Sequence, residues 1–97
     1  MARGRIVIRR PGLKTIVLDM VIEGCHVVSL RISGDFFVYP EEAVEEAEKL
    51  VADCDSAECV RSTLTSMAER SETVGMDWRV VGEEAARLFT RLCRRAS

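Results

Sequence analysis

Few residues in this chain of 97 have the types and spacing that enzyme chemistry needs. Its one histidine, His26, has no second base beside it to complete a triad with a hydroxyl nucleophile. The acidic run that begins at Glu41 has the spacing of a solvated helix face, whereas paired catalytic carboxylates need a desolvated pocket to separate their pKa values. The sequence also lacks a glycine-rich phosphate loop. We therefore predict no catalytic residue in this chain.

Four cysteines raise the question of a metal site or of disulfides. Their spacings contain no Cys-x-x-Cys pair, and Cys25 and His26 are adjacent in a predicted strand, where neighbouring side chains point to opposite faces. We predict no metal site and four free, buried cysteines, which is the usual state in cytosolic proteins. The chain has no Asn and no Gln, which is consistent with a thermophilic source. In a hyperthermophile a Cys54–Cys59 disulfide is the alternative.

Charge and hydropathy argue against two classes of partner. The net charge of -2 gives no general attraction to nucleic acid or to membranes. The apolar runs are far shorter than the roughly 20 residues that span a bilayer, and Met1–Arg5 lacks the apolar segment of a signal peptide, so we expect a cytoplasmic protein. A basic group near the N-terminus comprises Arg3, Arg5, Arg9, Arg10 and Lys14. This group could contact phosphates, but without interleaved aromatics we favour charges that protect a strand edge.

The segment from Ile32 to Phe37 combines a glycine, an acid and two adjacent aromatic rings. Gly34 can adopt a positive φ, and Asp35 can accept hydrogen bonds from nearby backbone N–H groups and stabilise a turn. Phe36 and Phe37 then point in different directions, so that one ring seals the core and the other remains available. The alternative is a plain strand-to-helix corner with both rings in the core.

Two hydrophobic periods divide the chain into a β half and an α half. Alternation of apolar residues predicts three strands, over about residues 5–9, 13–23 and 26–33. Helical spacing predicts three helices, over about residues 40–52, 56–71 and 78–94. A capping box from Asp55 to Glu58 would start the second helix, and Ser71–Gly75 would be a loop. We therefore predict one α+β domain over residues 1–97, a three-stranded antiparallel sheet followed by about three helices packed on one face.

The two faces of the predicted sheet differ in composition. The face expected to meet the helices carries Ile16, Leu18, Met20, Val28, Leu30 and Ile32. The opposite face mixes charges with Val7, Val17, Val21 and Val27. These valines either form a docking surface or are simply good strand residues that need no partner.

The order of these motifs resembles the C-terminal accessory domain of lipoate–protein ligases. The resemblance rests on the turn Pro11-Gly12-Leu13-Lys14, the turn Glu23-Gly24, the motif Ile32-Ser33-Gly34-Asp35-Phe36-Phe37 and the proline before the first helix. Val74-Gly75-Met76-Asp77 is a weaker match, and the resemblance covers roughly residues 5 to 93. The family commonly has a lysine before the first turn and a further glycine after it, where this chain has Arg10 and Leu13.

The resemblance implies a non-catalytic accessory subunit of a two-component lipoate–protein ligase. In that family the large domain holds lipoate and ATP, and the small part is needed to activate lipoate to lipoyl-AMP. The implied partner is the catalytic (large) subunit, with lipoyl-acceptor proteins as indirect partners. Lipoate and ATP with Mg²⁺ would belong to the complex, and this chain alone would bind no cofactor.

We expect one group of residues to lie together and face that catalytic subunit: Gly34, Asp35, Phe36, Phe37, Pro11, Gly12 and Lys14. One alternative is a homo-oligomeric small-ligand or regulatory domain that dimerises through the valine face. A nucleic-acid module that uses the N-terminal arginines is a further alternative, against which the net charge argues.

Overall fold

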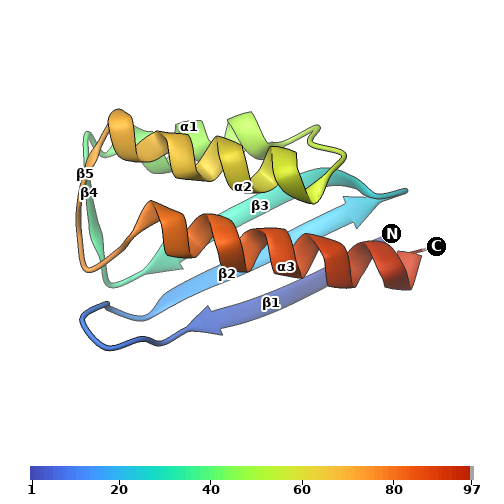
Figure 1. The fold of residues 1–97 in the computed structure, drawn as a ribbon, viewed down its shortest axis with the longest axis horizontal. Coiled ribbons are helices and arrows are strands. Elements are labelled where there is room, and N and C mark those ends of the chain that lie inside the picture. Colours follow the sequence, from blue (N-terminus) through green and yellow to red (C-terminus); the bar gives the residue numbers. More distant parts are fainter. Residues whose placement is uncertain (97) are drawn as a thin grey trace.

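Two layers make up the computed structural model, which describes residues 1–96. One layer is an antiparallel sheet in the order β1 (Ala2–Ile8), β2 (Ile16–Glu23), β3 (His26–Gly34). The other holds α1 (Glu42–Val51), α2 (Ala57–Ser66) and α3 (Trp78–Ala96) (Figure 1). Helix α3 packs on β1 and β2, α1 packs on β3, and α2 packs on the other two helices. The predicted α+β fold with helices on one face of the sheet is confirmed.

A second, smaller sheet was not predicted. Strands β4 (Phe37–Tyr39) and β5 (Glu72–Val74) pair in antiparallel fashion at one end of the domain, on the left in Figure 1. Strand β5 lies in the segment expected to be a loop, because three residues are too few to display a period of two. Helix α2 also ends earlier than predicted, and a 3-10 turn, Met67–Glu69, follows it.

The starts of several elements differ from the predicted ones. Strand β2 begins three residues later than expected because the chain from Arg10 to Leu13 forms a hydrogen-bonded turn. Helix α1 begins at Glu42, and the carbonyl of Pro40 accepts a hydrogen bond from the N–H of Ala43. Helix α2 is capped by Ser56 rather than by Asp55.

One prediction about the sheet faces is wrong. Val27, expected on the open face, is buried with 1% exposure, whereas Val28, expected in the core, is 46% exposed. The cause is a shift of register between Val21 and Ile22, typical of a β-bulge, which changes the alternation of side chains in β3. Val27 is also bonded to the α1–α2 loop, because its N–H donates to the carbonyl of Cys54 at 2.8 Å. The open face therefore carries Val7, Val17, Val21 and Val28.

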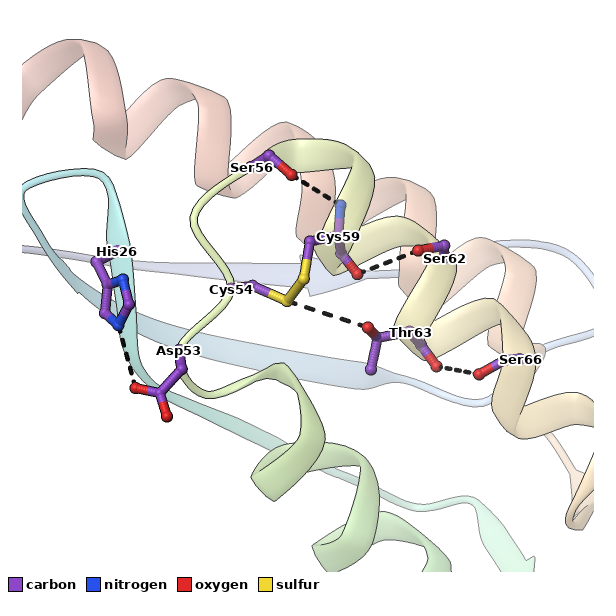
Figure 2. Close-up of a disulfide and its surroundings, with 8 residues drawn as sticks. All are labelled: His26, Asp53, Cys54, Ser56, Cys59, Ser62, Thr63 and Ser66. Atoms are coloured by element: carbon purple, nitrogen blue, oxygen red, sulfur yellow. Dashed lines mark hydrogen bonds and ion pairs between the residues drawn. A yellow bond between two sulfur atoms is a disulfide. The ribbon is translucent and has the colours of Figure 1, made fainter.

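The prediction of four free cysteines is also wrong. Cys25 is bonded to Cys93, and Cys54 is bonded to Cys59, with Cα–Cα separations of 4.8 and 5.6 Å. The first disulfide ties the β2–β3 turn to the last turns of α3, and the second closes the α1–α2 loop (Figure 2). Cys25 pairs with Cys93 because of the way α3 lies along the sheet. No local sequence pattern predicts that arrangement.

The α1–α2 loop is held by polar contacts around the second disulfide. The Ser56 hydroxyl accepts a hydrogen bond from the N–H of Cys59 at 3.1 Å, which caps α2 (Figure 2). On the other side of the loop, Nε2 of His26 lies 3.1 Å from a carboxylate oxygen of Asp53. No helix within residues 1–96 is both long enough and apolar enough to cross a membrane.

Candidate functional site

The β1–β2 turn projects from the end of the domain that also holds the small sheet (Figure 1). The N–H of Leu13 donates to the carbonyl of Arg10 at 3.1 Å, and Gly12 has a φ of 83°. Proline at the second position and a glycine with positive φ at the third are typical of a type II turn. The side chains of Pro11 and Lys14 are exposed on it.

Main-chain hydrogen bonds connect this turn to two other loops. The N–H of Lys14 donates to the carbonyl of Gly75 in the β5–α3 loop at 2.9 Å. The N–H of Asp35 donates to the carbonyl of Thr15 at 3.3 Å, which joins the β3–β4 corner to the start of β2. The two segments that the sequence analysis placed together, residues 11–14 and 34–37, are thus neighbours in the structure.

Gly34 allows this close approach. Its φ is 150°, and a Cβ atom there would collide with the carbonyl oxygen of Thr15 and lie 3.2 Å from Cα of Ile16. The corner is held by the main chain and not by the carboxylate of Asp35, which is exposed and bonds to nothing among residues 1–96. The expected turn-stabilising role of the Asp35 side chain is therefore wrong.

The two phenylalanines of the motif point in different directions. Phe36 is partly buried against the core, whereas Phe37 is 75% exposed. The structure thus has the first of the two predicted arrangements, with one ring inward and one outward. Residues in a strand alternate between faces, so Tyr39 also points outward, while Val38 between them is buried.

Phe37, Tyr39 and Val74 form an exposed apolar surface, here called the end patch. Tyr39 is 74% exposed and Val74 66% exposed, and Phe37 pairs directly with Val74 across the small sheet. A shallow groove of about 240 Å³ runs over the patch, and Glu41 and Glu72 contribute to its lining. Large apolar side chains that gather on a surface with a polar rim are typical of a protein-binding surface.

Partly buried polar contacts hold the end patch in position. The indole N–H of the buried Trp78 donates to the hydroxyl of Ser71 at 2.9 Å, and that hydroxyl in turn donates to the carbonyl of Met67 at 2.9 Å. The hydroxyl of Thr73 donates to the carbonyl of Met76 at 2.7 Å. These bonds fix Ser71, which precedes β5, and Thr73 in its middle, so the patch is presented on a held strand and needs little rearrangement to bind a partner.

Sequence reasoning found Phe37 but missed Tyr39 and Val74. The signal for Tyr39 was present, because Phe37, Val38 and Tyr39 are all residues that favour strands. Val74 joins the patch only through the pairing of β4 with β5, in which it lies opposite Phe37, 37 positions earlier in the chain. No group of three or more His, Cys, Asp or Glu side chains within residues 1–96 could hold a metal ion.

Comparison with known proteins gives one informative match. No protein-family model matches the chain, and no curated protein does. A solved chain from an archaeal lipoylation system matches it with a TM-score of 0.63 at 19% identity. That system is described as a bi-partite lipoate protein ligase and its E2 lipoyl domain from Thermoplasma acidophilum. The two chains share a fold. The match covers 77% of this chain and 89% of that chain.

Proposed function

We propose that this chain is a non-catalytic accessory subunit of a two-component lipoate–protein ligase. The observation that carries the proposal is the fold shared with a small chain from a bi-partite lipoate ligase system. The end patch supports it, because exposed aromatics on an ordered strand are suited to contact another protein. In the proposed complex, the end patch and the β1–β2 turn face the catalytic subunit.

In this proposal the chain acts by covering the partner's site. Apolar side chains that close over a reaction site exclude water from it, which protects a reactive adenylate from hydrolysis. Lipoate and ATP with Mg²⁺ bind to the catalytic subunit. Glu41 and Glu72 at the rim of the end patch would repel a triphosphate, so we assign no nucleotide contact to this surface.

The test of the proposed function is an adenylation assay of the cognate catalytic subunit. Formation of lipoyl-AMP from lipoate and ATP is measured with and without this chain, and the chain is expected to be required. Transfer of lipoate from pre-formed lipoyl-AMP to an acceptor domain is measured in parallel and is expected to depend on the chain less. Equal adenylation in the presence and absence of the chain would reject the proposed function. A stable homodimer that does not bind the catalytic subunit would reject it as well.

Removal of the two aromatic rings of the end patch is expected to weaken the complex. The double variant Phe37→Ser, Tyr39→Ser should raise the dissociation constant roughly 30- to 150-fold, equivalent to about 2–3 kcal/mol for two truncated interface aromatics. The stability of the free chain should change little, because both rings are mostly exposed. Isothermal titration calorimetry with the catalytic subunit measures the first effect, and urea unfolding measures the second.

Val28→Ser is the matched control for this prediction. Val28 is an exposed apolar residue of the main sheet, outside the end patch. This variant should bind the catalytic subunit as the unchanged chain does. If the aromatic double variant folds and binds equally well, the end patch is not the interface.

A further inference from the structure

The two outer edges of the main sheet differ in how their backbone groups are used. At the β3 edge, the N–H of Val27 donates to the carbonyl of Cys54 at 2.8 Å, and the carbonyl of Val27 accepts from the N–H of Asp53 at 3.0 Å. Further along, the N–H of Ile32 donates to the carboxylate of Glu48 at 2.7 Å. Because these groups are already bonded, much of the β3 edge is occupied and is a poor site for another strand.

The β1 edge is open. Strand β1 pairs over its whole length with β2 and has no strand on its other side within residues 1–96. Figure 1 shows it as the outermost strand, with α3 over one face and no element beyond it. Its seven residues are enough for a full ladder of hydrogen bonds with an added strand.

Positive charge lines the open face of the sheet beside this edge. Arg5 donates to the carboxylate of Asp19 at 2.7 Å, and this hydrogen bond, with the charge of Asp19, raises the pKa of Arg5. Arg3 has no acidic partner within the described residues. A groove of about 250 Å³ on this face is lined by Arg3, Arg5 and Arg31, with Asp19 as its one acid. The surface next to β1 therefore carries an excess of positive charge.

Helix α3 places further arginines along β1 on the other side. Glu84 lies 3.8 Å from Arg10, just beyond the end of β1, and a Cβ on Gly4 would be 3.0 Å from Leu88. This face of α3 therefore follows the strand. Residues seven and eleven positions after Glu84 share its face of the helix, and these are Arg91 and Arg95, both exposed.

We propose that the β1 edge accepts an extended, acidic segment of a partner protein as an added strand. Main-chain hydrogen bonds to β1 would supply affinity, and carboxylates at alternate positions would pair with Arg3 and Arg5 on the open face. Arg91 and Arg95 would add long-range attraction. A second copy of this chain is disfavoured, because antiparallel pairing of β1 with itself brings arginines of the two copies opposite or diagonal to each other.

This proposal goes beyond the proposed function and is tested without any ligase subunit. The probe is the peptide acetyl-Thr-Glu-Val-Glu-Val-Glu-Thr-amide, titrated at low salt into the full chain with its disulfides intact. Chemical shifts of backbone amides are followed by NMR. We expect saturable binding, with the largest shifts and slowed hydrogen exchange in β1, and no binding of the same peptide with lysine in place of glutamate.

Charge variants test the assignment. The double variant Arg3→Glu, Arg91→Glu should weaken peptide binding at least about tenfold, and Arg3→Lys should keep most of it. The matched control is Lys49→Glu in α1, which changes the same kind of charge on the β3 side of the sheet and should bind normally.

Four results would each overturn the proposal. They are the absence of saturable binding up to about 1 mM peptide, chemical-shift changes centred outside β1, equal loss of binding in the control variant, and a β1–β1 dimer. None of these results by itself tests lipoate activation, which the adenylation assay measures separately.

Discussion

Loss of the Cys25–Cys93 disulfide is expected to lower the free energy of unfolding by about 4 kcal/mol. The two cysteines are separated by 68 positions, so the bond closes a loop that includes most of the chain. A cross-link of this kind acts chiefly by removing conformations from the unfolded state, and its effect increases with loop length. Small domains typically have about 5–15 kcal/mol of stability in total. The double variant Cys25→Ser, Cys93→Ser should therefore be marginally stable.

The Cys54–Cys59 disulfide provides the matched comparison. Its sequence separation is only 5, and the same relation gives a stabilisation of about 2 kcal/mol. Urea unfolding of the oxidised chain and of the two double-serine variants, followed by the fluorescence of the buried Trp78, measures both losses. The first variant should lose clearly more stability than the second. Equal losses or the reverse order would show that loop closure is not the main contribution of these bonds.

The β half of the fold was largely predictable because its signals are local. Strand β2 is buried at every second position from Ile16 to Ile22, which is the alternation that the sequence displays. The prediction failed in β3, where the bulge moves Val27 into the core and Val28 to the surface. A pattern of period two does not show where a β-bulge inserts an extra residue, because either of two adjacent valines is suited to either face of the sheet.

The features that the sequence did not reveal depend on contacts between distant residues. Strand β5 exists as a strand because it pairs with β4, and Cys25 meets Cys93 because α3 runs along the sheet. In the candidate site, the motif around Gly34 was recognisable from its residue types. Its contact with the β1–β2 turn was a hypothesis until the Asp35 to Thr15 hydrogen bond placed the two segments together. Residue types thus identified the motif around Gly34, and contacts between distant segments placed the other residues of the candidate site beside it.

Gly34→Ala is expected to destabilise the chain by about 3 kcal/mol or more. Two costs combine in this variant: a φ of 150° is a conformation that residues with a Cβ rarely adopt, and the new methyl group collides with the Thr15 carbonyl. The collision is with backbone, so no side-chain rotation can relieve it. Urea unfolding of the oxidised chain measures the loss of stability.

Gly12→Ala separates the two costs. Gly12 also has a positive φ, of 83°, but a Cβ there would have no atom within 4 Å. This variant should lose only about 1–2 kcal/mol, the strain of a left-handed conformation. A similar loss in both variants would mean that the Thr15 carbonyl moves aside at little cost. The predicted difference matters for the site, because a shift of Thr15 would break the bond from Asp35 and displace Phe37. Gly34→Ala should then weaken binding of the proposed catalytic subunit even under conditions where the chain remains folded.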